Sequence, residues 1–201
     1  MLPKSERQYM SGRFVGLALT PTHRREIRHD AREPLPVADN SVEKIQSQDV
    51  FEHLEYESLP AVLDEIHRVL APSGTFRLSV PDYNSPLVLS RCVFDENGGV
   101  IADLRMGGSV RYDAETKRRK VEFLPDGGAH LWFPTYQKVQ ALIARSRIGQ
   151  CSAITFHHYF LNRKDHVVRD FPENEMFVKR APPHDGRAGG LPVSIIVDFV
   201  K

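Results

Sequence analysis

Cysteine is scarce in this sequence, and its two cysteines, Cys92 and Cys151, stand far apart. They form neither a disulfide framework nor a closely spaced ligand pair, so we expect no metal site and a reducing, cytoplasmic compartment. No apolar run approaches about 18 residues, the length typical of a membrane span. No apolar signal core follows Met1, so no membrane partner is expected.

An excess of charge of one sign is also missing. The chain has 27 Lys and Arg against 26 Asp and Glu, a formal net charge of +1. Such a balance does not favour nucleic acid as a partner. The length of 201 residues suits one domain. We expect a single domain over 1–201, in which the weakly periodic stretches 83–134 and 162–192 are insertions over a cleft.

The chain does have a strand–helix–strand pattern. Residues 42–47 alternate in polarity, apolar residues recur at helical spacing from Ser58 to Leu70, and residues 75–80 are β-branched and alternating. With Ser58 as helix cap, this order predicts a parallel crossover. Further predicted elements are strands at 13–19, near Ile27, at 153–161 and at 193–200, a hairpin at 110–124, and a helix at 135–148 capped by Thr135.

A linked series of short motifs surrounds this crossover. It consists of Leu35-Pro36, Asp39-Asn40-Ser41-Val42, Val50-Phe51-Glu52-His53-Leu54, Glu65-Ile66-His67-Arg68-Val69-Leu70, Pro72-Ser73-Gly74 and Val80-Pro81-Asp82. The series resembles the central part of Rossmann-like S-adenosylmethionine-dependent methyltransferases, and more narrowly the short type 11 members that modify small molecules or sugars. The resemblance implies an α/β sheet, shortened at its N-terminal side, with an antiparallel C-terminal strand pair.

The resemblance also assigns site residues. Asp30 stands where family members accept a hydrogen bond from the adenine amino group, and Ala31 offers its backbone N–H to the ring. Gln48 and Asp49 end the strand whose carboxyl edge faces the sulfonium of S-adenosylmethionine, in agreement with ligand binding beyond the carboxyl ends of strands. The pair Glu52-His53 takes a packing or capping role in the family.

Methyl transfer is an in-line displacement that needs an oriented acceptor and, for a hydroxyl, a general base. Asp49 and His130 are the predicted catalytic residues. Asp82, Tyr83 and Trp132 are the predicted substrate-binding residues. Each has a structural alternative: Asp49 as a cap of the following turn, Asp82-Tyr83 as a turn after a strand, and Trp132 as a roof over the core.

One part of the family pattern is missing. No G-x-G turn precedes Asp30, because Gly12 and Gly16 are separated by three residues. The strand at 13–19 is then either the family's second strand without its ribose-binding acid, or its first strand with the second almost deleted. The alternative function is therefore a non-catalytic binding or assembly protein that has lost the cofactor. A missing central strand would also expose a sheet edge, through which a homodimer could form.

Overall fold

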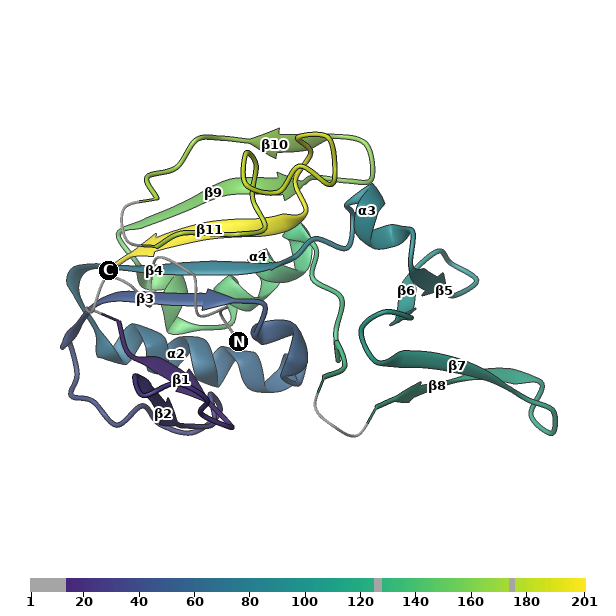
Figure 1. The fold of residues 1–201 in the computed structure, drawn as a ribbon, viewed down its shortest axis with the longest axis horizontal. Coiled ribbons are helices and arrows are strands. Elements are labelled where there is room, and N and C mark those ends of the chain that lie inside the picture. Colours follow the sequence, from purple (N-terminus) through teal and green to yellow (C-terminus); the bar gives the residue numbers. More distant parts are fainter. Residues whose placement is uncertain (1–13, 125–127, 174–175) are drawn as a thin grey trace.

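The structure, a computed structural model, describes residues 14–124, 128–173 and 176–201, so Gly12, Arg13 and Gly127 lie outside it. At its centre is a five-stranded sheet with the strand order β10–β9–β11–β4–β3 (Figure 1). Its strands are β3 (Val42–Gln48), β4 (Leu70–Pro81), β9 (Ala153–Phe160), β10 (His166–Val168) and β11 (Ser194–Val200). β3 and β4 are parallel, whereas the other neighbouring pairs are antiparallel. The expected α/β sheet with an antiparallel C-terminal strand pair is confirmed.

The predicted crossover joins β3 to β4 through helix α2 (Leu59–Val69). The loop expected at residues 71–74 is instead a bulge within β4, because the partner of Val42 is Leu70 whereas the partner of Lys44 is Thr75. Gly74 is needed there: a Cβ atom would lie 2.8 Å from the carbonyl oxygen of Ala71. The strand therefore begins directly where the helix ends.

The two faces of the sheet are covered differently. Helices α2 and α4 (Tyr136–Ala144) pack on one face (Figure 1), where they enclose the main core. The central apolar side chains of that core are fully buried and include Phe76, Ile195 and Phe199. On the other face the irregular segment formed by residues 171–173 and 176–181 packs, with Phe171, Val178 and Ala181 around Ile196.

A buried arginine joins that irregular segment to the sheet. The guanidinium of Arg77, on β4, donates two hydrogen bonds to Asp198 on β11, at 2.7 and 2.6 Å. It also donates to the carbonyl oxygens of Met176 and Pro172, at 2.7 and 3.0 Å. Arg77 is only 1% exposed where it makes these bonds. The irregular segment therefore covers this face of the sheet in the place of a helix layer.

The N-terminal strands stand apart from the main sheet. β1 (Gly16–Ala18) and β2 (Glu26–Arg28) pair in parallel with each other as a separate two-stranded sheet. Among the described strands, β3 pairs only with β4 and forms the edge of the five-stranded sheet. The sheet is thus shortened on its N-terminal side, as expected, and the strand predicted at 13–19 does not join it.

Two expected helix ends differ from the structure. Ser58 does not cap α2 with its side chain, because its hydroxyl donates to the carbonyl oxygen of Glu55. The second helix, capped by Thr135 as predicted, ends at Ala144, and a 3-10 turn, η3 (Arg147–Gln150), follows it.

Residues 86–123 form small elements between β4 and α4. They are helix α3 (Pro86–Leu89), the hairpin of β5 (Cys92–Phe94) with β6 (Val100–Asp103), and the hairpin of β7 (Gly108–Asp113) with β8 (Arg118–Phe123). The β7–β8 hairpin was predicted and is confirmed, and Figure 1 shows it extending away from the main sheet.

Candidate functional site

The carboxyl ends of β3 and β4 lie side by side, because Gln48 pairs with Ser79 in parallel register. Asp49 follows β3, and Asp82 and Tyr83 follow β4, so these predicted site residues leave the sheet at one edge. A short 3-10 helix, η1 (Phe51–His53), comes directly after Asp49. The sequence therefore brings polar side chains from the end of β3 and from the end of β4 to the same edge of the sheet.

Asp49 forms the turn at the end of β3. Its φ of 52° is in the left-handed region, which aspartate tolerates better than most residues. One carboxylate oxygen contacts Arg180 Nε at 3.1 Å, whereas Oδ1 is buried without a hydrogen-bond partner. Burial raises the pKa of Asp49 despite the opposing charge of Arg180. Asp49 does not cap η1, which has no side-chain cap.

Close to Asp49 lies a group of three side chains that we call the Glu–His cluster: Glu52, His53 and His130. One ligand atom from each of these side chains lies within 4.8 Å of the others. Glu52 Oε1 is 3.8 Å from His130 Nε2, and the rings of His53 and His130 meet edge to face. Neither oxygen of the Glu52 carboxylate has a hydrogen-bond partner, and His130 Nε2 has none either.

The segment 128–134 brings His130 to this position through its hydrogen bonds to η1. Leu131 N donates to Glu52 O at 2.8 Å, and Trp132 Nε1 donates to Phe51 O at 2.8 Å. Gly107, with φ of 70°, allows the close approach of this segment, because a Cβ there would lie 2.9 Å from Ala129 Cα. His130 is thus placed opposite Glu52 by backbone and indole contacts.

A hydrogen-bonded chain holds the other side of His130. The Tyr83 hydroxyl lies 2.5 Å from His130 Nδ1 and donates to Asp103 Oδ2 at 2.7 Å. Arg91 Nε donates to the same oxygen at 2.9 Å. Because the Tyr83 proton goes to Asp103, His130 Nδ1 is the donor and Nε2 carries the lone pair.

The pKa values in the cluster follow from burial. Burial lowers the pKa of His130 to about 3, with smaller contributions in the same direction from the neighbouring His53 and Arg91. Burial also raises the pKa of Glu52 well above its ordinary value, and the charge of Asp49 adds to this shift. Two groups with pKa values displaced in opposite directions at one strand edge are typical of functional sites.

Asp82 is engaged in the fold itself. Its two carboxylate oxygens accept hydrogen bonds from Phe160 N at 2.6 Å and from Asn84 N at 2.9 Å. The first bond joins the end of β4 to the end of β9, and Asp82 is fully buried. Trp132 is also buried, in the main core beside Tyr56. Asp82 and Trp132, two of the three predicted substrate-binding residues, therefore have structural contacts.

The predicted adenine side lies on the loop after β2. The Asp30 carboxylate receives two hydrogen bonds from the Arg32 side chain, Nε to Oδ1 at 3.0 Å and Nη2 to Oδ2 at 2.6 Å. This pairing lowers the pKa of Asp30 to about 2. Arg32 also approaches Glu55, at 3.8 Å, which places the loop near the segment that follows η1. Ala31 stands between the two paired residues.

Gln48 is used to hold the irregular segment. Its amide nitrogen donates to Phe177 O at 2.8 Å, and its oxygen accepts from Lys179 N at 3.2 Å. Together with the Asp49–Arg180 pair, these bonds place residues 177–180 against the end of β3. Gln48 and Asp49 are thus brought together, whereas Asp30 is held by a different set of contacts.

The helix α2 explains several motifs of the linked series. Arg68 donates to the carbonyl oxygens of Leu35 and Val37, each at 3.2 Å, and pairs with Asp39 and Glu65. Glu65 in turn accepts from Leu35 N at 2.6 Å. These motifs are therefore anchors that attach the loop after β2 to the main sheet through α2.

The sequence gives no hint of Asp103, which accepts from Tyr83, or of Arg91, which donates to Asp103, because both lie in a stretch without periodicity. The predicted role of Glu52 and His53 was packing or capping. The adjacent acid and imidazole immediately after a strand end are the signal that could have indicated a polar cluster.

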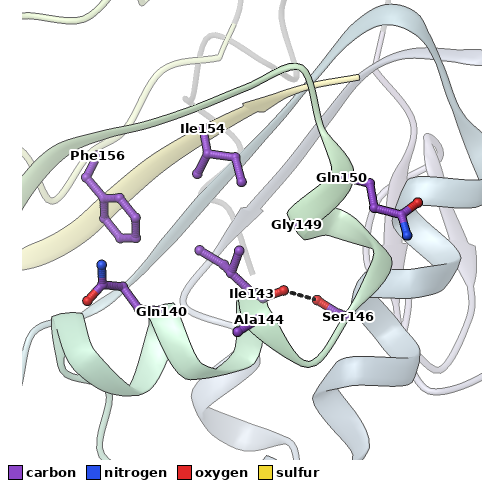
Figure 2. A pocket seen from close by; sticks show the side chains of 8 residues that line it. All are labelled: Gln140, Ile143, Ala144, Ser146, Gly149, Gln150, Ile154 and Phe156. Carbon is purple, nitrogen blue, oxygen red and sulfur yellow. Dashed lines mark hydrogen bonds between the residues drawn. The ribbon is translucent and has the colours of Figure 1, made fainter.

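One hollow on the surface lies away from this edge. Figure 2 shows it between α4, η3 and β9, lined by side chains that include Gln140, Ile143 and Phe156. Its lining has no acid, base or nucleophile from the predicted set. A second hollow is lined by Pro86, Leu87 and Arg187 among others, close after the end of β4. The titratable side chains predicted for the site thus lie at the strand ends and not in the larger hollow.

Comparison with known protein families gives a match over part of the chain. Residues 10–78 match the family model of a methyltransferase domain. This stretch includes Asp30, Asp49 and the motifs anchored by Arg68, so the match agrees with the resemblance to a methyltransferase over that part of the chain. No curated protein matches the chain.

Several solved structures are similar over 88% of this chain. A protein from Pyrococcus horikoshii OT3 has 20% identity and a TM-score of 0.43, with 59% of its own length covered. A SAM dependent methyltransferase from Archaeoglobus fulgidus has 13% identity, a TM-score of 0.43 and 67% of its length covered. An S-adenosylmethionine dependent methyltransferase from Mesorhizobium loti has 14% identity, a TM-score of 0.41 and 69% covered. The chain thus spans less than two thirds of the first of these proteins.

In the structure both Asp30 oxygens accept hydrogen bonds from Arg32, so an adenine amino group at the predicted position would have to share or replace that contact. After β1 the chain continues with Leu19 and Thr20, so no carboxylate follows that strand to bind ribose. No helix of the described residues is long and apolar enough to cross a membrane.

Proposed function

We propose that this chain is an S-adenosylmethionine-dependent methyltransferase that acts on a small molecule or sugar. The observation that carries the proposal is the position of Asp49, which ends a parallel strand at the carboxyl edge within the stretch that matches a methyltransferase domain. Asp30 and Ala31 bind the adenine in this proposal, and Asp49 lies at the reacting centre. S-adenosylmethionine supplies the activated methyl group.

The acceptor approaches from the same edge. A hydroxyl acceptor must lose a proton, and an Asp49 carboxylate with one unpartnered oxygen offers an acceptor for it. His130 and Tyr83 lie deeper and act by holding η1 and the turn after β4 in place. The segment 177–180, seated on Gln48 and Asp49, excludes water from the edge when the substrates are bound.

Calorimetric titration with S-adenosylhomocysteine tests the proposal. We expect binding in the wild-type chain, and a loss of about 1–3 kcal/mol in Asp30→Ala, the cost of an unmade hydrogen bond to a charged group. Arg32→Ala should bind at least as tightly as wild type, because Asp30 is released from its partner. No binding by the folded wild-type protein at millimolar ligand would exclude the enzyme.

The chain contains a matched control for Asp30. Asp113, in the β7–β8 turn, accepts a backbone hydrogen bond from Glu115 two residues later, just as Asp30 accepts one from Arg32. Asp113→Ala therefore removes the same local turn contact far from the carboxyl edge. It should leave the affinity unchanged.

A second candidate function is a non-catalytic binding or assembly protein. Its support is that Asp30, Gln48 and Asp49 all have partners within the chain. This candidate predicts a folded protein that does not bind S-adenosylhomocysteine even in the Arg32→Ala variant. A homodimer through the β3 edge stays a prediction for either function, and sedimentation over a range of concentrations measures it.

A further inference from the structure

The Glu–His cluster is built from two parts of the chain that converge at the carboxyl edge. Glu52 and His53 come from η1, and His130 comes from the segment that precedes α4. Glu52 is fully buried and His130 is 1% exposed. Both present unpartnered polar atoms toward each other, and a buried polar group that nothing satisfies destabilises the fold.

We propose that Glu52, His53 and His130 bind a divalent transition-metal ion, for which Zn²⁺ is the probe. Two imidazoles and one carboxylate are a ligand set that zinc and its first-row neighbours use, with further positions left open. Magnesium and calcium prefer sites made only of oxygen, so the two histidines disfavour them.

The distances suit an ion after a small movement. Ligand atoms around zinc bind at about 2.0–2.2 Å, so neighbouring ligands of a tetrahedral site lie roughly 3.3–3.5 Å apart. Glu52 Oε1 and His130 Nε2 are 3.8 Å apart, and all three ligand atoms lie within 4.8 Å. The distance between Glu52 Oε1 and His130 Nε2 is too long for a hydrogen bond and slightly longer than the spacing of two ligand atoms on one zinc ion. Side-chain rotations that move these atoms by about 1 Å complete the site.

Both histidines are held in the orientation that a metal ligand requires. His53 Nδ1 lies 2.9 Å from the carbonyl oxygen of Ala129, to which it donates, so Nε2 is the ligand atom. His130 Nδ1 donates to Tyr83, which donates to Asp103. A ring nitrogen that donates to a carbonyl, or through a hydroxyl to a carboxylate, is the usual outer support of a metal-binding histidine.

The proposal departs from the sequence expectation of no metal site, and it does not depend on methyl transfer. Metal binding is measured on tag-free protein freed of metal by a chelator, by competition between the protein and a chromophoric zinc indicator. Co²⁺ serves as a second probe, because its visible spectrum reports nitrogen and oxygen ligands in low coordination. We expect one equivalent of Zn²⁺ per chain and an intense cobalt spectrum.

Variants then assign the site. Glu52→Gln and His53→Asn should each raise the Kd for Zn²⁺ by more than about 100-fold, and Tyr83→Phe by about 10- to 100-fold. His166→Asn, on the exposed strand β10, is the matched histidine control and should leave the Kd unchanged. Circular dichroism establishes that each variant is folded.

Three results would overturn the proposal. One is a wild-type protein that takes up neither Zn²⁺ nor Co²⁺, which would mean that the cluster holds a water or a direct Glu52–His130 hydrogen bond. Another is metal binding that survives in the Glu52 and His53 variants. The third result applies if the variants do not fold. In wild-type protein labelled with ¹⁵N, zinc must then shift the Nε2 signals of His53 and His130. Shifts confined to other histidines would place the ion elsewhere and overturn the proposal.

Discussion

The five-stranded sheet and the β1–β2 pair hold their apolar side chains in opposite ways. In the sheet, Phe76 and Phe199 are fully buried between the strands and the helices α2 and α4. In the β1–β2 pair, Leu17 is 48% exposed and Ile27 is 50% exposed. Since burial of apolar surface is the main source of stability, the sheet stabilises itself, whereas the pair adds little.

This difference separates the two halves of the proposed site. Asp49, Asp82 and Tyr83 follow strands of the main sheet and are built into its edge. Asp30 follows β2, and its loop is attached to α2 by polar contacts from Glu65 and Arg68. The side of the site that faces the acceptor is therefore fixed by the core, and the adenine side is fixed by surface hydrogen bonds and ion pairs.

The largest expected effect concerns the face of the sheet without helices. Arg77→Met should lower the free energy of unfolding by about 3–5 kcal/mol, because it leaves the buried Asp198 with His157 as its remaining side-chain partner. Urea unfolding measures the loss. The double variant Arg77→Met, Asp198→Leu should recover part of it, since both members of the ion pair are then gone, although His157 loses its acceptor. A loss below about 1 kcal/mol in the single variant would mean that this face is open to water, and the contrast with β1–β2 would weaken.

Periodicity explains why the sheet could be predicted. The apolar face of α2 and the β-branched residues of β4 and β11 are local signals, and they reflect burial in a core that the whole chain shares. The bulge at Gly74 was missed, because Pro72-Ser73-Gly74 has the composition of a loop and only the pairing with β3 makes it part of a strand.

The site could be predicted only where it follows a strand end. Asp49 and Tyr83 were found in this way. The neighbours that determine their chemistry were not: Asp103 and His130 reach Tyr83 from small hairpins and a loop, whose placement depends on contacts such as Trp132 with Phe51. In the same way, the hydrogen bond from Phe160 N to Asp82 depends on the position of β9 relative to β4, which no local pattern encodes.

A second test measures the unfolding free energy against pH and compares Asp82, on the main sheet, with Asp30, on the loop after β2. Burial raises the pKa of Asp82 from 3.8 to about 6, against the lowering effect of its bonds from Phe160 N and Asn84 N. A raised folded pKa gives stability that is complete below the unfolded value and is lost as the pH rises through about 6. Unfolding free energy should therefore fall by about 1 kcal/mol between about pH 5 and 7.5.

The variant Asp82→Asn isolates this group. It should be less stable than wild type overall, because an amide cannot accept both backbone hydrogen bonds. Its unfolding free energy should nevertheless change less between about pH 5 and 7.5 than that of wild type. Asp30, whose pKa is lowered to about 2 by Arg32, lies outside this pH window, so an equal flattening in Asp30→Asn would contradict the assignment.

The smallest expected effect is at β1. Leu17→Ala should change the unfolding free energy by less than about 0.5 kcal/mol, because the side chain is already half exposed. The matched control is Leu78→Ala on β4, where the leucine is 3% exposed and the loss should be about 2–5 kcal/mol. A cost at Leu17 that approaches the cost at Leu78 would show that the β1–β2 pair is covered by an apolar partner in solution. If that cost rises with protein concentration, the partner is a second copy of the chain, and the adenine side of the site is then stabilised by assembly.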